Sequence, residues 1–173
     1  VHSGELKVFG KTVHITHPCQ AVELGMGFAT EDRKAQGPFL NQTIKDNIAI
    51  ASPRRVSSNG FMKGKEETRL ANQYMQELKI AAPDIFKVCK FLSGGNQQKV
   101  VVAKWLARNS RVVIFDEPTR GIDVAAKVEI YNLMNQLKQN GIGVMFVSSE
   151  MPEVLGMSDR ILVMCDGRIT GEF

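Results

Sequence analysis

Two adjacent acids at the end of an apolar run are the residues with the most specific chemistry in this sequence. Residues 112–115 are continuously apolar, and Asp116 and Glu117 follow them directly. Because an unpaired buried carboxylate costs free energy, such acids need a positive partner, and Mg²⁺ bound to a phosphate is one. Asp116 could hold the metal through a water molecule. Glu117 could be the general base that polarises an attacking water, whereas the structural alternative is an acid pair that caps a helix.

A serine followed by two glycines is the second chemically suggestive feature. Ser93 is a favourable helix N-cap, and Gly94 and Gly95 allow another molecule to approach the backbone closely. The free N–H groups and the dipole of a helix N-terminus attract anions such as phosphate. We therefore predict an anion-binding site over Ser93, Gly94, Gly95, Asn96 and Gln97. A simple capping turn is the alternative, but it does not explain why the turn precedes the acid-terminated run.

Hydrophobic periodicity predicts the elements that would position these residues. Strand patterns cover 27–30, 111–115 and 143–148, and hairpin patterns cover 5–15 and 161–173. We expect the strand over 111–115 to be covered on both faces and the strand over 143–148 to be buried. Helical patterns cover 18–24, 43–50, 65–78, 94–107, 124–139 and 152–156. The repeated strand–helix–strand order in the second half predicts a parallel α/β fold.

Two segments without a periodic pattern are expected to be loops. Residues 31–37 are charged, and residues 52–64 are polar and contain Pro, Gly and paired serines. The helix over 124–139 should have one apolar face that packs on the core. That face is expected to consist of Val128, Tyr131, Leu133, Met134 and Leu137.

Composition limits the class of protein. The chain has 173 residues, of which 43% are hydrophobic and 23% charged, a balance typical of one globular domain with a core. Its apolar runs have strand length, far short of the roughly 20 residues that a membrane helix needs. The net charge of +4 is spread along the chain. The nearest approach to a basic cluster lies in the polar loop and favours a solvated surface over a phosphate or lipid contact.

The number and spacing of the cysteines do not indicate a structural role in disulfides or in a metal site. Cys19, Cys89 and Cys165 are far apart and odd in number, and none forms a CxxC pair. Neither a zinc site nor a set of disulfides is predicted, and isolated thiols suit a reducing compartment. Because the chain begins with Val rather than Met, we expect it to be a fragment or a processed form.

Taken together, the motifs resemble those of ABC transporter ATPases. Residues 92–98, LSGGNQQ, are similar to the signature motif of that family, and residues 112–117, VVIFDE, to its Walker B strand. Residues 120–123, RGID, look like the D-loop. Residues 29–34, ATEDRK, stand where the Q-loop belongs, and residues 147–150, VSSE, where the switch loop belongs. These variants are most similar to the second, C-terminal half of duplicated sugar-importer ATPases, which serve ribose, xylose and galactose.

The resemblance implies a fold. It is the α/β core of an ABC-type P-loop NTPase, a parallel sheet with an antiparallel β fringe and a helical subdomain. We expect a partial β and core segment over 1–32, which contains the Q-loop-like residues. The helical subdomain is expected over 33–90, and the signature helix with the α/β core over 91–173. The P-loop strand and helix are expected to be missing.

The resemblance also implies roles. ABC sites form between two ATPase halves, so Ser93 to Gln97 would contact ATP held by the opposite half. Asp123 would organise the shared interface. Glu117 would be the catalytic base and Asp116 the Mg²⁺ residue of this half's own site. The cofactors implied for the intact protein are ATP and Mg²⁺.

Three departures from the family pattern weaken the chain's own site. Ser149 stands at the switch position, where the family has His, and Glu31 is the nearest match to the Q-loop Gln. No G-x4-G-K-[ST] loop is present. The stretch from Gly4 to Thr12 looks close to it, but it has five residues between its glycines and lies in a hairpin pattern. We therefore expect this chain by itself to be inactive, although its intact parent would hydrolyse ATP.

Partners follow from the same resemblance. They would be the other ATPase half, the transmembrane permease subunits and, indirectly, a periplasmic sugar-binding protein, with no nucleic acid. A groove after Glu31 that includes Phe39 and Leu40 would receive a permease helix, which places the protein peripherally on the cytoplasmic face of the membrane. A soluble ABC ATPase of translation or of DNA repair is the alternative class. Ser149 argues against the first, the lack of heptads against the second, and a non-catalytic interaction module remains open.

Overall fold

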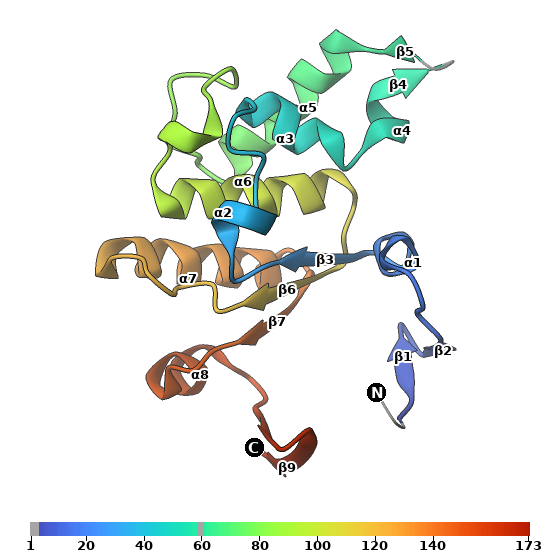
Figure 1. The fold of residues 1–173 in the computed structure, drawn as a ribbon, viewed down its shortest axis with the longest axis vertical. Helices are drawn as coiled ribbons and strands as arrows, with labels where there is room; N and C mark the ends of the chain where they lie inside the picture. The colour runs from blue at the N-terminus through green and yellow to red at the C-terminus, as the bar shows by residue number, and fades with distance from the viewer. Residues whose placement is uncertain (1–3, 59–60) are drawn as a thin grey trace.

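The computed structural model describes residues 4–58 and 61–173, in which strands and helices alternate along the chain (Figure 1). The strands are β1 (Leu6–Val8), β2 (Lys11–Val13), β3 (Met26–Ala29), β4 (Ser57–Ser58), β5 (Phe61–Met62), β6 (Val112–Asp116), β7 (Gly143–Val147), β8 (Leu162–Cys165) and β9 (Arg168–Glu172). The helices are α1 (Pro18–Glu23), α2 (Arg33–Gln36), α3 (Ile44–Ile50), α4 (Pro53–Val56), α5 (Gly64–Glu77), α6 (Gly94–Ala107), α7 (Val124–Gln139) and α8 (Met151–Met157), with a short 3₁₀ turn η1 (Cys89–Phe91).

The central sheet has three parallel strands in the order β3-β6-β7. Its register places Phe28, Ile114 and Met145 side by side on one face, and Ala29, Phe115 and Phe146 on the other. Because the strands are parallel, the segments that follow β3, β6 and β7 leave the sheet at the same edge. The remaining strands pair as the antiparallel hairpins β1-β2, β4-β5 and β8-β9. The predicted α/β class with a parallel sheet and an antiparallel fringe is confirmed.

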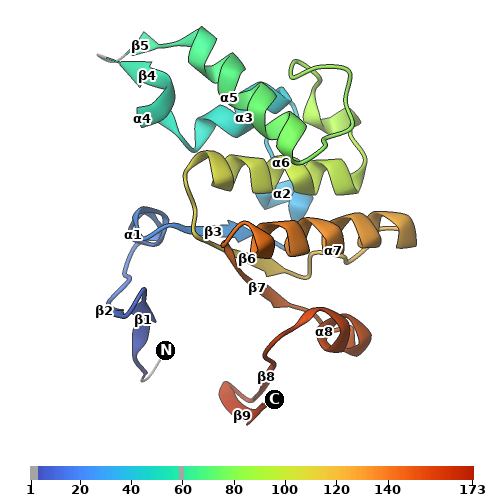
Figure 2. The same cartoon turned by 180° about the vertical axis from the view of Figure 1, so that it is seen from behind.

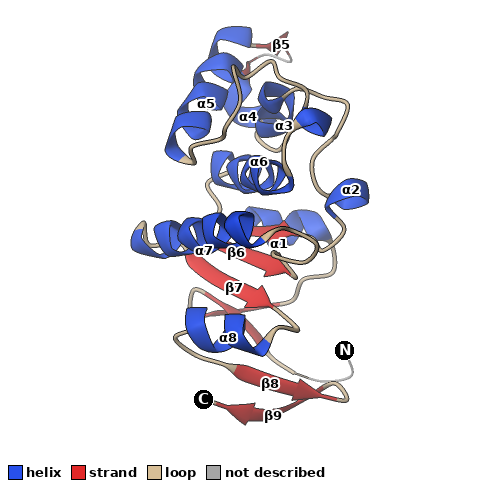
Figure 3. Ribbon diagram, turned by 90° about the vertical axis from the view of Figure 1, so that its left-hand side faces the viewer, coloured by secondary structure: helices blue, strands red, loops and turns tan. Residues whose placement is uncertain are grey.

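Helices α6 and α7 cover one face of the sheet. On that face Ala29, Val113 and Phe115 are fully buried. Trp105 of α6 fixes the contact with β3, because its indole N–H donates to Phe28 O at 2.7 Å. On the side of α6 away from the sheet lie α3, α4 and α5 (Figures 1 and 3). The hairpins β1-β2 and β8-β9 lie at the opposite end of the molecule from α5, as the view from behind also shows (Figure 2).

The opposite face of the sheet is open in the part of the chain that the structure describes. Phe28 is 45% exposed, Met145 54% and Val147 50%. The expectations that residues 111–115 are covered on both faces and that residues 143–148 are buried are therefore wrong. An apolar run indicates a strand, but it does not show how many helical layers cover that strand.

Short elements inside the predicted loops are further corrections. The charged loop over 31–37 contains α2, and the polar loop over 52–64 contains α4 and the β4-β5 pair, with residues 59–60 outside the described part. Val128 was expected to face the core, yet it is 50% exposed. The buried positions of α7 are Ile130, Leu133, Met134 and Leu137. The α7 face that packs on the core is thus rotated toward Ile130.

The hairpin predicted over 5–15 is confirmed. It overlaps the stretch from Gly4 to Thr12, whose sequence is close to the pattern of a phosphate-binding loop. Strands β1 and β2 pair antiparallel across the turn residues Phe9 and Gly10, which have φ angles of 51° and 78°. Two positive φ values are typical of the tight turns that suit hairpin twist. Residues from Gly4 to Thr12 therefore form a strand pair rather than a loop at a helix N-terminus. The domain boundary predicted at 90/91 stays a prediction, although α6 packs on α3 and α5 as well as on β3.

Candidate functional site

Glu117 lies directly after β6 and is bound to the loop that follows β7. Its backbone has a φ of 43°, and its N–H donates to Val147 O at 2.9 Å. Its carboxylate Oε1 accepts from the backbone N–H of Ser149 at 2.9 Å. The predicted catalytic acid and the predicted switch position are therefore in contact, through the main chain of Ser149. No described residue donates a hydrogen bond to the second carboxylate oxygen of Glu117.

Asp116 is the last residue of β6 and lies on the open face of the sheet, in register with Val147. None of the described residues donates a hydrogen bond to the carboxylate of Asp116 or forms an ion pair with it. A partly buried acid without a protein partner fits a metal bound through water. Within residues 4–58 and 61–173 no group of three or more His, Cys, Asp or Glu is arranged to hold a metal ion. Asp116 would therefore be a single protein contact to a metal, and Mg²⁺ is an ion that usually keeps several water ligands.

The signature-like residues begin α6. Ser93 is its N-cap, and the hydroxyl accepts from the Asn96 N–H at 3.4 Å. The Asn96 side chain is buried and both of its polar atoms have partners, because it donates to Ser93 Oγ at 2.9 Å and accepts from the Ala81 N–H at 2.7 Å. Gln97 donates its side-chain amide to two carbonyls of the preceding segment. The backbone N–H groups of Asn96 and Gln97 are bound to Ser93, which leaves those of Ser93, Gly94 and Gly95 for an anion.

A cleft of about 310 Å³ joins the start of α6 to the D-loop-like segment. Its lining residues are Gly94, Gly95, Gln97, Gly121, Ile122, Asp123 and Ala126. Asp123 also caps α7, since its carboxylate accepts from the Ala126 N–H at 2.9 Å. The structure thus brings together the signature-like and D-loop-like residues, whereas Glu117 does not line this cleft.

Glu31, the Q-loop-like residue, forms an ion pair with Arg120. Arg120 is the first residue of the D-loop-like segment, so this pair links the segment that follows β3 to the segment that follows β6. Both side chains are largely exposed, and exposed pairs contribute roughly 0–1 kcal/mol. The contact therefore brings these two segments together without adding much stability.

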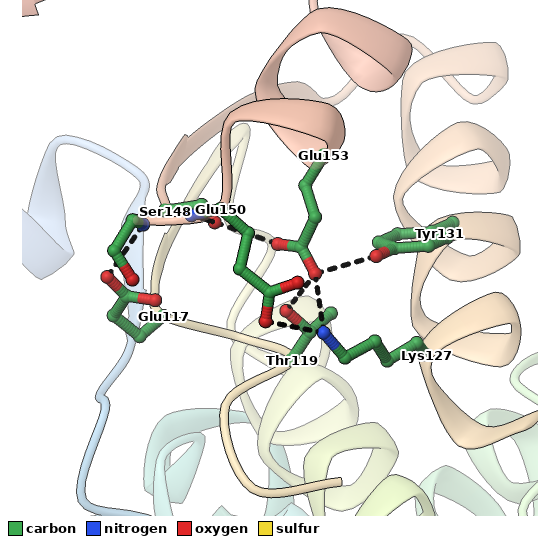
Figure 4. A network of polar contacts seen from close by, with 8 residues as sticks. Glu117, Thr119, Lys127, Tyr131, Ser148, Glu150 and Glu153 are labelled. Carbon is green, nitrogen blue, oxygen red and sulfur yellow. Dashed lines mark hydrogen bonds and ion pairs between the residues drawn. The ribbon is translucent and has the colours of Figure 1, made fainter. Parts of the chain in front are cut away.

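Glu153 is a buried acid that the sequence reasoning missed. It lies in α8, is 6% exposed, and accepts hydrogen bonds from Thr119, Tyr131, Ser148 and Lys127 (Figure 4). Burial raises the pKa of Glu153, but these four donors lower it by more, so the pKa lies below its ordinary value. Burial and the neighbouring carboxylate raise the pKa of Tyr131 to about 12. The available signal was an acid four residues after the switch position Ser149, which periodicity alone does not distinguish from a solvated one.

A parallel sheet in which β6 ends in an acid pair, beside a glycine-started helix that opens onto an adjoining loop, is the arrangement expected of the ABC-type ATPase fold. The family model described as ABC transporter matches residues 1–120. This chain belongs to the ABC transporter family. The resemblance drawn from the motifs is thereby confirmed.

Curated relatives narrow the comparison. The putative ribose/galactose/methyl galactoside import ATP-binding protein 1 of Burkholderia lata is 49% identical over 173 residues, which are 99% of this chain and 34% of that protein. The ribose import ATP-binding protein RbsA of Lactococcus lactis subsp. cremoris is 47% identical, over 98% of this chain and 34% of that protein. The xylose import ATP-binding protein XylG of Thermoanaerobacter pseudethanolicus is 48% identical, with the same coverage. The chain spans about a third of the length of these relatives.

Solved structures agree on the fold. A Clostridium perfringens subunit of a cbiONQ ABC transporter complex superimposes with a TM-score of 0.79 at 21% identity, over 99% of this chain and 66% of that one. A dimeric ATP-binding cassette bound to ADP and Pi gives a TM-score of 0.76 at 22% identity, over 99% and 73%. At these identities the likeness shows the ABC ATPase fold. In addition, no helix among the described residues is both long and apolar enough to cross a membrane.

Proposed function

We propose that this chain is part of the ATPase subunit of a carbohydrate importer, in the second ATPase half, and that it supplies a signature motif, a Walker B strand and a D-loop. The observation that carries the proposal is the cleft between Gly94, Gly95 and Asp123, which leaves the backbone N–H groups of the α6 N-terminus available beside the D-loop-like segment. The sugar-import names of relatives that align with nearly the whole chain support the class of solute.

In this proposal the cleft binds the terminal phosphate of ATP held by the other ATPase half. Gly94 and Gly95 donate their N–H groups, and the helix dipole adds a favourable field for the phosphate charge. On the chain's own side, Asp116 would hold Mg²⁺ through water, and the metal would neutralise phosphate charge. Glu117 would accept a proton from water through the carboxylate oxygen that Ser149 does not occupy.

The helical layer is the proposed contact to the transmembrane permease. Phe39 is 55% exposed, although its backbone N–H and C=O are both bound by the buried side chain of Asn47, at 2.7 and 3.0 Å. An exposed aromatic ring on a fixed backbone suits a docking position. A permease helix beside Phe39 would place the subunit on the cytoplasmic face of the membrane, with a periplasmic sugar-binding protein as an indirect partner.

The test compares two substitutions in the intact subunit. Gly94→Leu should lower ATPase activity more than Glu117→Gln does, because it fills the cleft that completes the partner half's site, whereas the chain's own site lacks a switch His. Steady-state ATPase rates measure both. Gly64→Leu, at the open N-terminus of α5, is the matched glycine control and should leave the rate unchanged. Equal losses for the Gly94 and Glu117 variants would contradict the assignment.

The same proposal predicts weak nucleotide binding by the 173-residue chain alone. The stretch from Gly4 to Thr12, its nearest approach to a phosphate loop, is a hairpin. Isothermal calorimetry with Mg·ATP should therefore give little heat at micromolar concentrations. Low-micromolar binding would overturn this part of the proposal.

A further inference from the structure

The Glu153 carboxylate is the most heavily hydrogen-bonded side chain around the switch loop, and the proposed function does not use it. Its Oε1 accepts from Thr119 Oγ1 at 2.5 Å, from Tyr131 OH at 2.6 Å and from Lys127 Nζ at 3.3 Å. Its Oε2 accepts from Ser148 Oγ at 2.8 Å. A buried carboxylate loses its hydration, so it is tolerated only where donors replace that water.

These donors come from three separate segments. Thr119 follows the Walker B-like acids, Lys127 and Tyr131 lie one helical turn apart on α7, and Ser148 begins the loop after β7 (Figure 4). One buried side chain therefore ties three segments together beside the proposed catalytic acid. Glu150 differs in this respect, since it is exposed and its side chain pairs with Lys127 at the surface.

Ser148 connects this cluster to Glu117. Its hydroxyl donates to Glu153 and accepts from the Glu150 N–H at 3.0 Å, so both its side chain and the peptide that follows Ser149 are fixed. Between these two anchors lies Ser149, whose backbone N–H donates to Glu117 Oε1. The direction of that N–H thus depends on Ser148, and Ser148 depends on Glu153.

We propose that Glu153 is a positioning residue: through Ser148 it directs the Ser149 backbone N–H onto Glu117, so that the switch position of this chain acts through its main chain. A backbone N–H is present whichever side chain a residue carries. The contact with Glu117 therefore does not need the His that the family has at this position, which is consistent with Ser149. The bond holds one oxygen of Glu117 and leaves the other free. The catalytic consequence rests on the proposed function of Glu117, whereas the structural coupling does not.

Amide hydrogen exchange of the 173-residue chain, followed by NMR, tests the coupling. Glu153→Gln keeps the shape of the side chain but replaces one acceptor oxygen with a donor. The Ser149 and Glu150 amides should then exchange about tenfold faster, the change expected when a hydrogen bond to a charged group is lost. The Val113 amide in the centre of the sheet is the internal reference and should not change.

Glu150→Gln is the matched control, because it removes a neighbouring acid that also pairs with Lys127 but is exposed. It should leave Ser149 exchange within about twofold, since an exposed pair contributes little. Unchanged Ser149 exchange in Glu153→Gln would overturn the proposal, as would an equal effect of Glu150→Gln. If Glu153→Gln does not fold, Ser148→Ala removes the link and leaves three donors on Glu153. Continued protection of Ser149 in that variant would equally overturn it.

Kinetics of the intact subunit separate this proposal from the proposed function. Glu153→Gln should lower kcat several-fold and leave KM for ATP unchanged, because it touches no residue proposed to bind nucleotide. A raised KM with unchanged kcat would contradict a positioning role. If Glu117→Gln does not alter the rate, the proposed role of Glu117 fails, and Ser149 exchange still decides whether Glu153 positions the loop.

Discussion

Gln97 and Gln98 are adjacent and chemically identical, yet the amide of Gln97 is hydrogen-bonded and that of Gln98 is not. Gln97 donates its side-chain amide to Cys89 O and Leu92 O, both at 3.2 Å. Gln98 is 1% exposed, and neither its Oε1 nor its Nε2 has a hydrogen-bond partner in the described residues. A buried amide without partners costs about 1–3 kcal/mol. Gln98 is therefore a destabilising residue within a well-packed helix.

Gln98→Met should raise the free energy of unfolding by about 1–2 kcal/mol, because a side chain of similar length without amide groups removes the unpaired donors and acceptor. Gln97→Met is the control and should lower it by about 1 kcal/mol through the loss of two hydrogen bonds. Urea denaturation monitored by Trp105 fluorescence measures both. A destabilised Gln98→Met would show that its amide has a partner in solution.

At the scale of single residues, the sequence predicted the residues that belong to recognisable motifs. It did not predict which other side chains hold those residues in place. Asp116, Glu117 and Ser149 could be recognised from motif type and spacing, and the structure brings the last two into contact. The inward orientation of Asn96 was not predictable, because the same amide could face a ligand or the chain's own backbone. Glu153 was missed since its donors lie up to 34 positions away in the sequence.

Elements with strong end signals were predicted best. The bounds of α6 and α7 match the expectation, and both begin at a side-chain cap, Ser93 and Asp123. Capping residues fix helix starts because they satisfy otherwise unpaired N–H groups. Helices α2 and α4 were missed because four residues cannot display a helical period. The coverage of β7 was mispredicted because burial depends on other layers and not on the strand itself.

The packing of α6 on β3 depends on a residue without a side chain. A Cβ on Gly27 would lie 2.8 Å from both Cβ and Cγ of Trp105, closer than such atoms approach in folded proteins. Gly27→Ala should therefore lower the free energy of unfolding by about 1–3 kcal/mol, the usual cost of overpacking. Gly64→Ala, where a Cβ meets open space, should be neutral or slightly stabilising. Equal effects on the thermal midpoint would contradict the close contact.

Beyond the hydrophobic core, a few side-chain hydrogen bonds join distant segments of the molecule. Tyr74 OH donates to Leu106 O and joins α5 to the end of α6, and Lys99 joins α6 to α7 through Glu129. Near the carboxyl ends of the strands, Glu153 joins α8 to α7 through Tyr131 and to the segment after β6 through Thr119. The acid therefore contributes to global stability as well as to the local geometry of the switch loop.

This predicts how the stability of the molecule depends on pH. The pKa of Glu153 is lower in the folded chain than its ordinary value of 4.5, so its contribution is fully present above that value and is lost as the pH falls through the folded pKa. Glu153→Gln should be less stable at neutral pH, and its free energy of unfolding should fall less steeply in acid. The free energies of unfolding of the native chain and of Glu153→Gln should converge at low pH. Protonation of Glu153 removes the negative charge from the native chain, and the substitution removes the same charge at every pH. Glu150→Gln, the exposed neighbour, should keep the native slope. Urea titrations at a series of pH values measure these curves, and a native acid slope in Glu153→Gln would show that another group dominates.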